Sequence, residues 1–384
     1  MTEVLFEIGV DRLDTGLRGY PVGTVRSSSV DPQTGVRYVG VPIDQLADFE
    51  PEKVMYLLLR KHFPEADELA SFKNELISRS RLPEGVLELL KGLPQQSHPM
   101  DWLISGILYL GMFESPTGNY EEDGLRLVAR VPEVVAAIFR IRSGWGDPIP
   151  SKPELGYVEN FVHMLGAPDA SPHLDRLLRS FNVLHYDHGG GNLSTFTGKA
   201  VASGLANIYT SMASAMAALG GPLHGRANQN ALEFVREIGT DDPESIRAFV
   251  MDCLEKKRVI PGFGHGVLRA EDPRARVLYG IGEEICPEDP LFRVIRQMRE
   301  VVPSVLSENP KIQNPYPNVD AATGTLLQAC GLKDPEYYTV LFGWSRVVGI
   351  TAQIIDERTV ARSGKGAPIY RPKYVPVDQP HRDV

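Results

Sequence analysis

The sequence contains very little cysteine. Only Cys253, Cys286 and Cys330 occur among 384 residues, and they are far apart, with no CxxC pair. Such spacing excludes a disulfide framework and is typical of proteins in a reducing compartment. We therefore expect a cytoplasmic location.

The sequence also lacks an excess of basic residues and a long uninterrupted apolar run. Lys and Arg number 40 against 49 Asp and Glu, a net charge of -9, whereas phosphate binding along a nucleic acid needs a basic footprint. The most apolar segment, 205–223, is interrupted by Asn207, Thr210, Ser211 and Ser214, which does not suit a bilayer span. The opening residues MTEVLFEIGVDRLD have no basic start before an apolar core, so no secretory signal is expected. These absences predict a soluble protein with neither nucleic acid nor membrane as a partner.

What the sequence does contain is a long series of segments with helical periodicity. A strong β pattern occurs only at 24–43, where TVRSSSV and VRYVGVPI flank a turn at 31–35. Helices are expected around 54–63, 66–78, 84–92, 99–113, 123–142, 153–165, 171–186, 195–219, 224–238, 243–257, 272–286, 288–307, 321–330 and 335–360. Pro132 should kink or split the helix that contains it. The fold class predicted is all-α, with one short N-terminal β-hairpin.

The first polar motif of interest is GGPLHGRANQ. Gly220 and Gly221 should end one helix, and His224 should lie in the opening turn of the next. There the positive end of the helix dipole would disfavour imidazolium and keep the ring a neutral donor, suited to a carbonyl that is becoming an enolate. The alternative is a histidine that merely packs at a helix start.

The second motif, HYDHGGGN, holds His185, His188 and Asn192 at the end of an apolar helix. Its glycines let a ligand approach the backbone, and His188 and Asn192 can donate hydrogen bonds to that ligand. It could instead be a glycine-rich helix end with surface histidines. A zinc site that adds His224 and His265 is a further alternative, but the spacing matches no ligand motif such as HExxH, so we expect no metal.

The third motif, PGFGHGVLRAEDPR, places His265 between glycines and follows it with Arg269 and Arg274. The glycines would let a ligand lie against the loop, and arginine is the natural fork for a carboxylate or phosphate. A turn with solvated charges is the alternative.

A fourth motif, NPYPNVD, ends at Asp320 just before a helix. This carboxylate is either a helix cap or a candidate base held behind two prolines. Further on, Arg346 lies inside an apolar helix, where a buried cation needs an anion to meet it.

Together, HYDHGGGN, GGPLHGRANQ, PGFGHGVLRAEDPR, NPYPNVDA, LFGWSR and YRPK, in this order, resemble the motifs of the citrate synthase family, over nearly the whole chain from Gly19 to Arg371. The resemblance implies that His224, His265 and Asp320 are the catalytic residues. It also implies three groups of binding residues: oxaloacetate contacts at His188, Asn192, Arg274 and Arg346; Arg371 reaching into the neighbouring subunit's site; and Arg269 and Lys311 at the phosphates of coenzyme A.

The same resemblance implies a helical homodimer that binds oxaloacetate and acetyl-CoA. Residues 1–226 and 335–384 would form a large domain, and 227–334 a small domain that closes over the substrate. The expected activity is that of an acyltransferase at the entry of the tricarboxylic acid cycle: condensation of acetyl-CoA with oxaloacetate, then hydrolysis of citryl-CoA. No tightly bound cofactor is expected, since the coenzyme A thioester is a co-substrate. A 2-methylcitrate synthase that uses propionyl-CoA is the close alternative, because one methylene gives only about 1–3 kcal/mol of discrimination.

The residues alone do not exclude two other classes of function. A metal-dependent hydrolase using His185, His188 and His224 would lose its activity with a chelator, and a noncatalytic helical binding protein would bind ligands without releasing CoA. Neither explains why arginines accompany the histidine loops.

Overall fold

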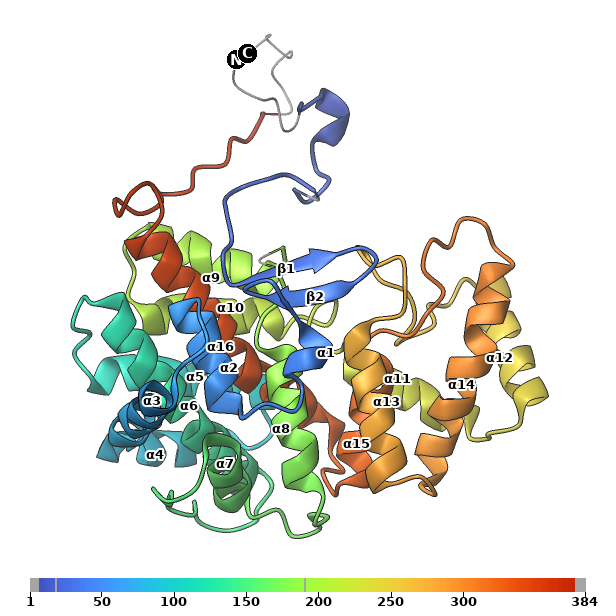
Figure 1. The fold of residues 1–384 in the computed structure, drawn as a ribbon, viewed down its shortest axis with the longest axis horizontal. Helices are drawn as coiled ribbons and strands as arrows, with labels where there is room; N and C mark the ends of the chain where they lie inside the picture. Colours follow the sequence, from blue (N-terminus) through green and yellow to red (C-terminus); the bar gives the residue numbers. More distant parts are fainter. Residues whose placement is uncertain (1–6, 18, 190, 377–384) are drawn as a thin grey trace.

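The structure is a computed structural model that describes residues 7–17, 19–189 and 191–376. Within these residues it contains sixteen α-helices, two short 3-10 helices and one small sheet (Figure 1). The mostly helical fold predicted from the sequence is confirmed. No helix among the described residues combines the length and the apolar character needed to cross a membrane.

The N-terminal β-hairpin forms as predicted, with one additional short strand. The Asp31 carboxylate accepts hydrogen bonds from the backbone of Gln33 and Thr34, and Gly35 has a φ of 86°, so local chemistry fixes the turn. The sheet is antiparallel in the order β1-β2-β3, with β1 at Ser28–Asp31, β2 at Gly35–Tyr38 and β3 at Val41–Pro42.

Most predicted helices are present, with ends shifted by a few residues. The helices are α1 Ile43–Leu46, α2 Pro51–Arg60, α3 Ala66–Arg79, α4 Glu84–Lys91, α5 Pro99–Phe113, α6 Tyr120–Arg142, α7 Tyr157–Leu165, α8 Leu174–His185, α9 Leu193–Ser203, α10 Ile208–Leu219, α11 Ala227–Ile238, α12 Pro243–Glu255, α13 Pro273–Ile285, α14 Pro290–Ser307, α15 Asp320–Ala329 and α16 Tyr338–Thr359. The 3-10 helices are η1 Val10–Arg12 and η2 Pro335–Tyr337.

The single helix predicted at 195–219 is wrong, because two helices, α9 and α10, occupy this stretch. The chain turns at Leu205, whose φ is 65°, and Asn207 then caps α10 by accepting a hydrogen bond from the backbone of Thr210 at 2.9 Å. The apolar spacing continues across the break, so periodicity alone could not reveal it.

Pro132 does not split α6, which runs through it as one helix. Proline has no N–H, so the carbonyl of Val128 one turn earlier lacks its helical donor. The hydroxyl of Tyr157 donates to that carbonyl at 2.9 Å, so a side chain from the start of α7 replaces the missing bond.

Two groups of helices meet along α16. Helices α11 to α15 pack mainly against one another and lie on the right in Figure 1, whereas α2, α5, α6, α8, α9 and α10 pack around α16. The first group joins the second through contacts of α11 with α16 and of α13 and α15 with α8. Most of α16 is buried, so it forms the centre of the hydrophobic core. The loops that carry the candidate site residues lie where the two groups adjoin.

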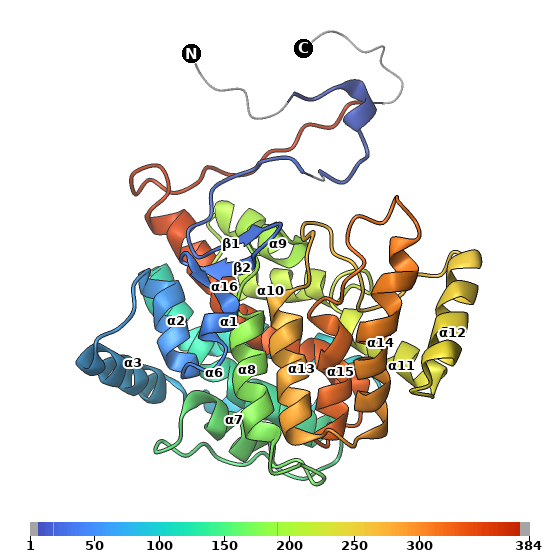
Figure 2. The same ribbon diagram turned by 45° about the vertical axis from the view of Figure 1, so that its right-hand side comes forward.

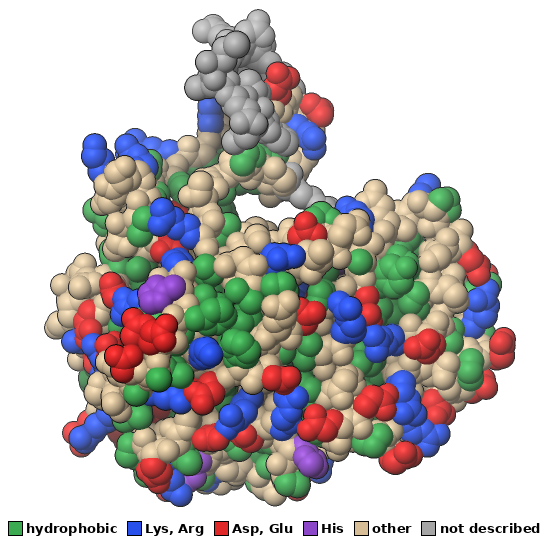
Figure 3. Space-filling view, in the orientation of Figure 1, with side chains coloured by type: hydrophobic (Ala, Val, Ile, Leu, Met, Phe, Trp, Pro, Cys, Tyr) green, Lys and Arg blue, Asp and Glu red, His purple; other side chains and the backbone are tan. Residues whose placement is uncertain are grey.

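The segment after α16 leaves the helical body and runs beside the N-terminal segment that precedes β1 (Figure 2). On the face drawn in Figure 3, basic and acidic side chains are interspersed rather than gathered by sign.

Candidate active site

The structure brings most of the predicted site residues into one cluster. The rings of His188 and His265, from loops far apart in sequence, have centroids 5.5 Å apart. Burial, and next the charge of Arg274, lower the pKa of both histidines, so this arginine lies near both. Arg346 also contributes to the low pKa of His188. Two neutral imidazoles therefore lie beside two buried cations.

The loop after α8 is held by an aspartate that sequence reasoning missed. Asp187 is fully buried and accepts hydrogen bonds from the hydroxyls of Ser27 and Ser28, at 2.5 and 2.7 Å, and from the amide of Gln353 at 2.7 Å. It also accepts from the backbone N–H of His188 at 2.8 Å. The β-hairpin is thus tied to the loop that carries His188.

Asn192 is the N-cap of α9. Its Oδ1 accepts from the backbone N–H of Thr195 at 2.9 Å and from the hydroxyl of Ser194 at 2.8 Å. Its Nδ2 is buried and has no hydrogen-bond partner among the described residues. This unsatisfied amide can donate to a ligand oxygen.

The sequence predicted that His224 lies in the opening turn of a helix, and this prediction is wrong. It lies in a turn that precedes α11, and its Nε2 instead accepts from the backbone N–H of Ser194, in the first turn of α9, at 3.2 Å. Its pKa is lowered to about 4, first by burial and then by Arg346. The ring is neutral at pH 7 as expected, and burial is the main cause of its lowered pKa. The same nitrogen, Nε2, lies 2.9 Å from the hydroxyl oxygen of Ser194. Because a backbone N–H can only donate, we assign Nε2 as the acceptor and place the ring proton on Nδ1.

His265 has the opposite tautomer. Its Nδ1 accepts from the backbone N–H groups of Val267 and Leu268, both at 3.0 Å, so the proton of the neutral ring lies on Nε2. Gly262 has a φ of 82°, and a Cβ there would lie 2.7 Å from Cα of Ala321 on α15. A side chain would not fit, so glycine brings this loop against α15.

Asp320 is the first residue of α15 and does not cap it, which makes the cap interpretation wrong. The N-cap is Val319, and the Asp320 carboxylate accepts no hydrogen bond from the described residues. Burial raises the pKa of this carboxyl to about 6, against the opposing effect of Arg274. Such a carboxylate is largely ionised at pH 7 and more basic than an ordinary one.

The two buried arginines differ in their partners. Arg274 forms a two-pronged ion pair with Asp272: Nε lies 3.0 Å from Oδ1 and Nη2 lies 2.7 Å from Oδ2. Arg346 is 2% exposed, and its Nε donates to the carbonyl of His185 at 2.9 Å. Neither Nη of Arg346 has a hydrogen-bonding partner among the described residues. A buried cation with free N–H donors can bind a carboxylate, which accepts these hydrogen bonds.

Three predicted residues lie at the margin of the cluster or outside it. Arg269 is partly buried beside the His265 loop, and its Nη1 donates to the carbonyls of Val267 and Leu268. Lys311 is exposed on the loop after α14. Arg371 is exposed beyond α16 and makes no described contact with the cluster.

The zinc alternative receives no support from the geometry. Within the described residues, no group of three or more His, Cys, Asp or Glu side chains could hold a metal ion. His185 is buried, and its Nδ1 is 2.8 Å from the carbonyl of Phe181.

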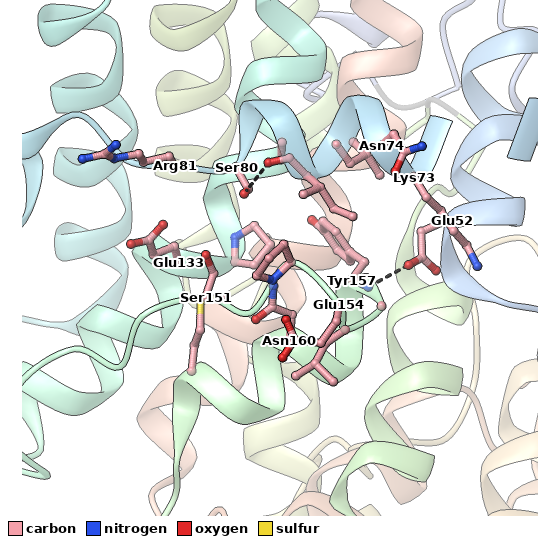
Figure 4. A pocket seen from close by; sticks show the side chains of 18 of the residues that line it. Glu52, Lys73, Asn74, Ser80, Arg81, Glu133, Ser151, Glu154, Tyr157 and Asn160 are labelled. Atoms are coloured by element: carbon pink, nitrogen blue, oxygen red, sulfur yellow. Dashed lines mark hydrogen bonds between the residues drawn. The ribbon is translucent and has the colours of Figure 1, made fainter. Parts of the chain in front are cut away.

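A separate cavity of about 540 Å³ lies between α3, α6 and α7 (Figure 4). Ser80, Glu133, Tyr157 and Asn160 are among its lining residues, and none of the predicted site residues lines it. It is therefore distinct from the histidine and arginine cluster.

Comparison with known proteins agrees with this geometry. Residues 16–373 match the family model described as citrate synthase, C-terminal domain. The chain is 38% identical to citrate synthase 4, mitochondrial, of Arabidopsis thaliana, over 97% of this chain and 83% of that protein. It is 36% identical to the peroxisomal citrate synthase of Saccharomyces cerevisiae, over 96% of this chain and 84% of that protein.

Solved structures give the same result. The citrate synthase of Thermotoga maritima matches with a TM-score of 0.80 and 30% identity over 96% of this chain and 99% of that one. That of Pyrobaculum aerophilum matches with a TM-score of 0.84 and 28% identity, over 96% and 94%. The fold is shared at 23% identity and a TM-score of 0.79, over 94% and 97%, with the citrate synthase of Thermoplasma acidophilum, solved as a ternary complex with carboxymethyl coenzyme A and oxaloacetate. A family model that spans most of the chain, and relatives that match nearly all of it, show that the chain belongs to the citrate synthase family.

Proposed function

We propose that the protein condenses acetyl-CoA with oxaloacetate and hydrolyses citryl-CoA to citrate and CoA. One cluster of side chains carries this proposal. It combines the neutral histidines His224 and His265, which have opposite tautomers. It also contains a carboxylate of raised pKa that caps no helix, Asp320, and a buried arginine with free N–H donors, Arg346. These groups are the ones that the reaction needs.

The first step is removal of a proton from the acetyl methyl group. Asp320 is the proposed base, because its pKa of about 6 leaves it ionised yet unusually basic. His224 is proposed to donate from Nδ1 to the thioester oxygen as negative charge develops there. A neutral donor aimed at the forming enolate lowers the barrier without having to lose a proton itself.

The second step joins the methylene carbon to the keto carbon of oxaloacetate. His265 is proposed to donate from Nε2 to the keto oxygen, and Arg346 to bind a substrate carboxylate through its free Nη atoms. Arg274, His188 and Asn192 are proposed to complete the oxaloacetate contacts. Two observations support this arrangement: Nδ2 of Asn192 has no partner among the described residues, and Arg274 lies near His188 and His265.

Hydrolysis of citryl-CoA needs water that has to be excluded during enolisation. We therefore propose that 227–334 is a small domain that closes over the substrates, with 1–226 and 335–384 as the large domain. The packing of α11 to α15 mainly against one another supports this division. Arg269 and Lys311 are the proposed contacts to the phosphates of coenzyme A.

The proposal includes a homodimer in which Arg371 enters the neighbouring subunit's active site. Its exposure on an arm beyond α16 supports a role outside its own subunit. A cytoplasmic location is also proposed. Its support is that all three cysteines are free, whereas the two relatives compared by sequence are named mitochondrial and peroxisomal.

The direct test is CoA release from the purified protein with oxaloacetate, comparing acetyl-CoA with propionyl-CoA. The proposal predicts release that depends on oxaloacetate, is unaffected by a chelator and is faster with acetyl-CoA. A preference for propionyl-CoA would instead assign 2-methylcitrate synthesis, and no release with either thioester would overturn the proposal.

A further inference from the structure

The arm that carries Arg371 is anchored to its own subunit immediately before that residue. The backbone of Ala367 donates to the carbonyl of Glu357 at 3.1 Å, and Arg358 donates to the carbonyl of Ala367 at 2.7 Å. These bonds fold the arm back along the end of α16. Beyond Tyr370, residues 371–376 are exposed and make no described hydrogen bond, ion pair or ring contact.

Tyr370 is the last anchored residue and makes three different contacts. Its backbone N–H donates to the hydroxyl of Ser203 at 3.0 Å, and its own hydroxyl donates to Oε1 of Glu357 at 2.7 Å. Its ring stacks on Phe196, with centroids 6.1 Å apart and planes 14° apart. Together these contacts fix the backbone, the tip and the face of one side chain.

The acceptor of the Tyr370 hydroxyl belongs to a buried ion pair. Oε2 of Glu357 lies 2.7 Å from Nζ of Lys199, and both residues are 8% exposed. Burial of two charges costs desolvation free energy, so a buried ion pair adds little net stability. Here the pair holds the carboxylate that receives Tyr370.

Helix α9 connects this anchor with the active site of the same subunit. Lys199, Phe196 and Ser203 lie along α9, and the first turn of the same helix carries Ser194, whose N–H donates to His224. The origin of the arm is therefore fixed relative to the catalytic cluster. Arg371 follows Tyr370 directly, within about 3.8 Å between Cα atoms.

We propose that Tyr370, held by the Lys199–Glu357 pair, is a positioning residue that places Arg371 in the neighbouring subunit's active site. This inference rests on the proposed role of Arg371. The contacts of Tyr370 given above lie within its own subunit, whereas its proposed effect is on oxaloacetate binding in the other subunit.

Tyr370→Phe removes the hydroxyl and keeps the stacked ring. We expect the KM for oxaloacetate to rise about three- to ten-fold, the usual effect of one lost hydrogen bond, with little change in kcat or in the KM for acetyl-CoA. Glu357→Gln should act in the same direction. Tyr56→Phe is the matched control, because it also removes a hydroxyl that donates to a glutamate, Glu68 at 3.0 Å, but between α2 and α3 and away from the arm and the site. The KM of this variant for oxaloacetate should not change.

Mixed dimers identify the site that is affected. Tyr370→Phe subunits are exchanged with an excess of Asp320→Asn subunits, so that nearly every Tyr370→Phe subunit is in a heterodimer. The only site with an intact Asp320 then receives its arm from the Asp320→Asn subunit, whose Tyr370 is intact. We expect a wild-type KM for oxaloacetate in the mixture. A raised KM would mean that Tyr370 acts on its own subunit's site and would overturn the inference.

The same exchange with Arg371→Ala separates this inference from the proposed function. If Arg371→Ala is complemented but homodimeric Tyr370→Phe has a normal KM, the positioning role is wrong and the shared site stands. If Arg371→Ala is not complemented, the shared site itself is wrong. In an Arg371→Ala background Tyr370→Phe should add no further rise in KM, and an additive rise would show that Tyr370 acts independently of Arg371.

Discussion

The backbone N–H of Ser194 donates to Nε2 of His224 at 3.2 Å, although Ser194 lies in α9 and His224 lies in the turn before α11. This contact fixes which nitrogen of the neutral ring carries the proton. The first turn of α9 thus holds His224 as a donor through Nδ1, and it is at the same time the turn capped by Asn192. A single helix start therefore serves both the thioester and the oxaloacetate sides of the proposed site.

His224→Ala should slow enolisation more than it weakens binding. We expect exchange of the acetyl methyl protons with solvent to fall about 10²- to 10³-fold, as when one donor to an oxyanion is removed. Exchange is followed by NMR with a dicarboxylate that fills the oxaloacetate site but has no keto group. Undiminished exchange would exclude His224 as the donor to the enolate.

The raised pKa of Asp320 predicts a pH-dependent stability difference. The folded-state pKa of about 6 lies above 3.8, the ordinary value for an aspartate, so the wild-type protein loses stability as the pH rises through that interval, when a buried carboxyl has to ionise. Asp320→Asn cannot ionise and avoids this cost. Its Tm should exceed that of the wild type at pH 7.5, and the difference should narrow as the pH is lowered to 5. A constant difference would contradict the assigned pKa.

The two buried arginines should respond differently to replacement by leucine. Arg274→Leu leaves Asp272 buried without its ion-pair partner, which should lower the free energy of unfolding by about 3–5 kcal/mol. Arg346→Leu strands no directly paired anion, so its stability should change much less. Urea unfolding distinguishes the two variants, and equal losses would mean that Arg346 also has a buried counterion.

Arg346→Leu should instead affect substrate binding. We expect the KM for oxaloacetate to rise about 10- to 100-fold, because a charge-assisted hydrogen bond to a carboxylate is lost. Steady-state kinetics with acetyl-CoA held at saturation measure this rise. An unchanged KM would remove Arg346 from the oxaloacetate site.

Local chemistry made part of the fold predictable. The hairpin was predictable because Asp31 and Gly35 encode its turn within five residues, and most helices because their apolar spacing is regular. The break at Leu205 was not, because the residues on both sides keep the helical spacing while one non-glycine residue adopts a positive φ. The hydroxyl of Tyr157, on α7, donates to the carbonyl of Val128, on α6, and no local sequence pattern predicts such a contact between two helices.

For the site, residue types and glycine loops indicated which side chains would converge but not their partners. Arg274 and Asp272 are two positions apart in the DPR motif, but this spacing alone does not show that their side chains form an ion pair. The role of Asp187 could not be predicted, because its donors, Ser27 and Ser28, are about 160 positions away in the chain. The tautomer of His224 likewise depends on a long-range contact. The sequence attributed the neutrality of this ring to a helix start, whereas burial is the main cause of its low pKa.

The most direct measurement of the central claim is the turnover of Asp320→Asn. The substitution keeps the size of the side chain and disturbs no cap or hydrogen bond, since the Asp320 carboxylate makes none with the described residues. CoA release from acetyl-CoA and oxaloacetate should fall about 10²- to 10⁴-fold, while oxaloacetate affinity, measured by calorimetry, stays close to that of the wild type. Near-normal turnover in a folded Asp320→Asn protein would contradict the assignment of Asp320 as the base and, with it, this account of the active site.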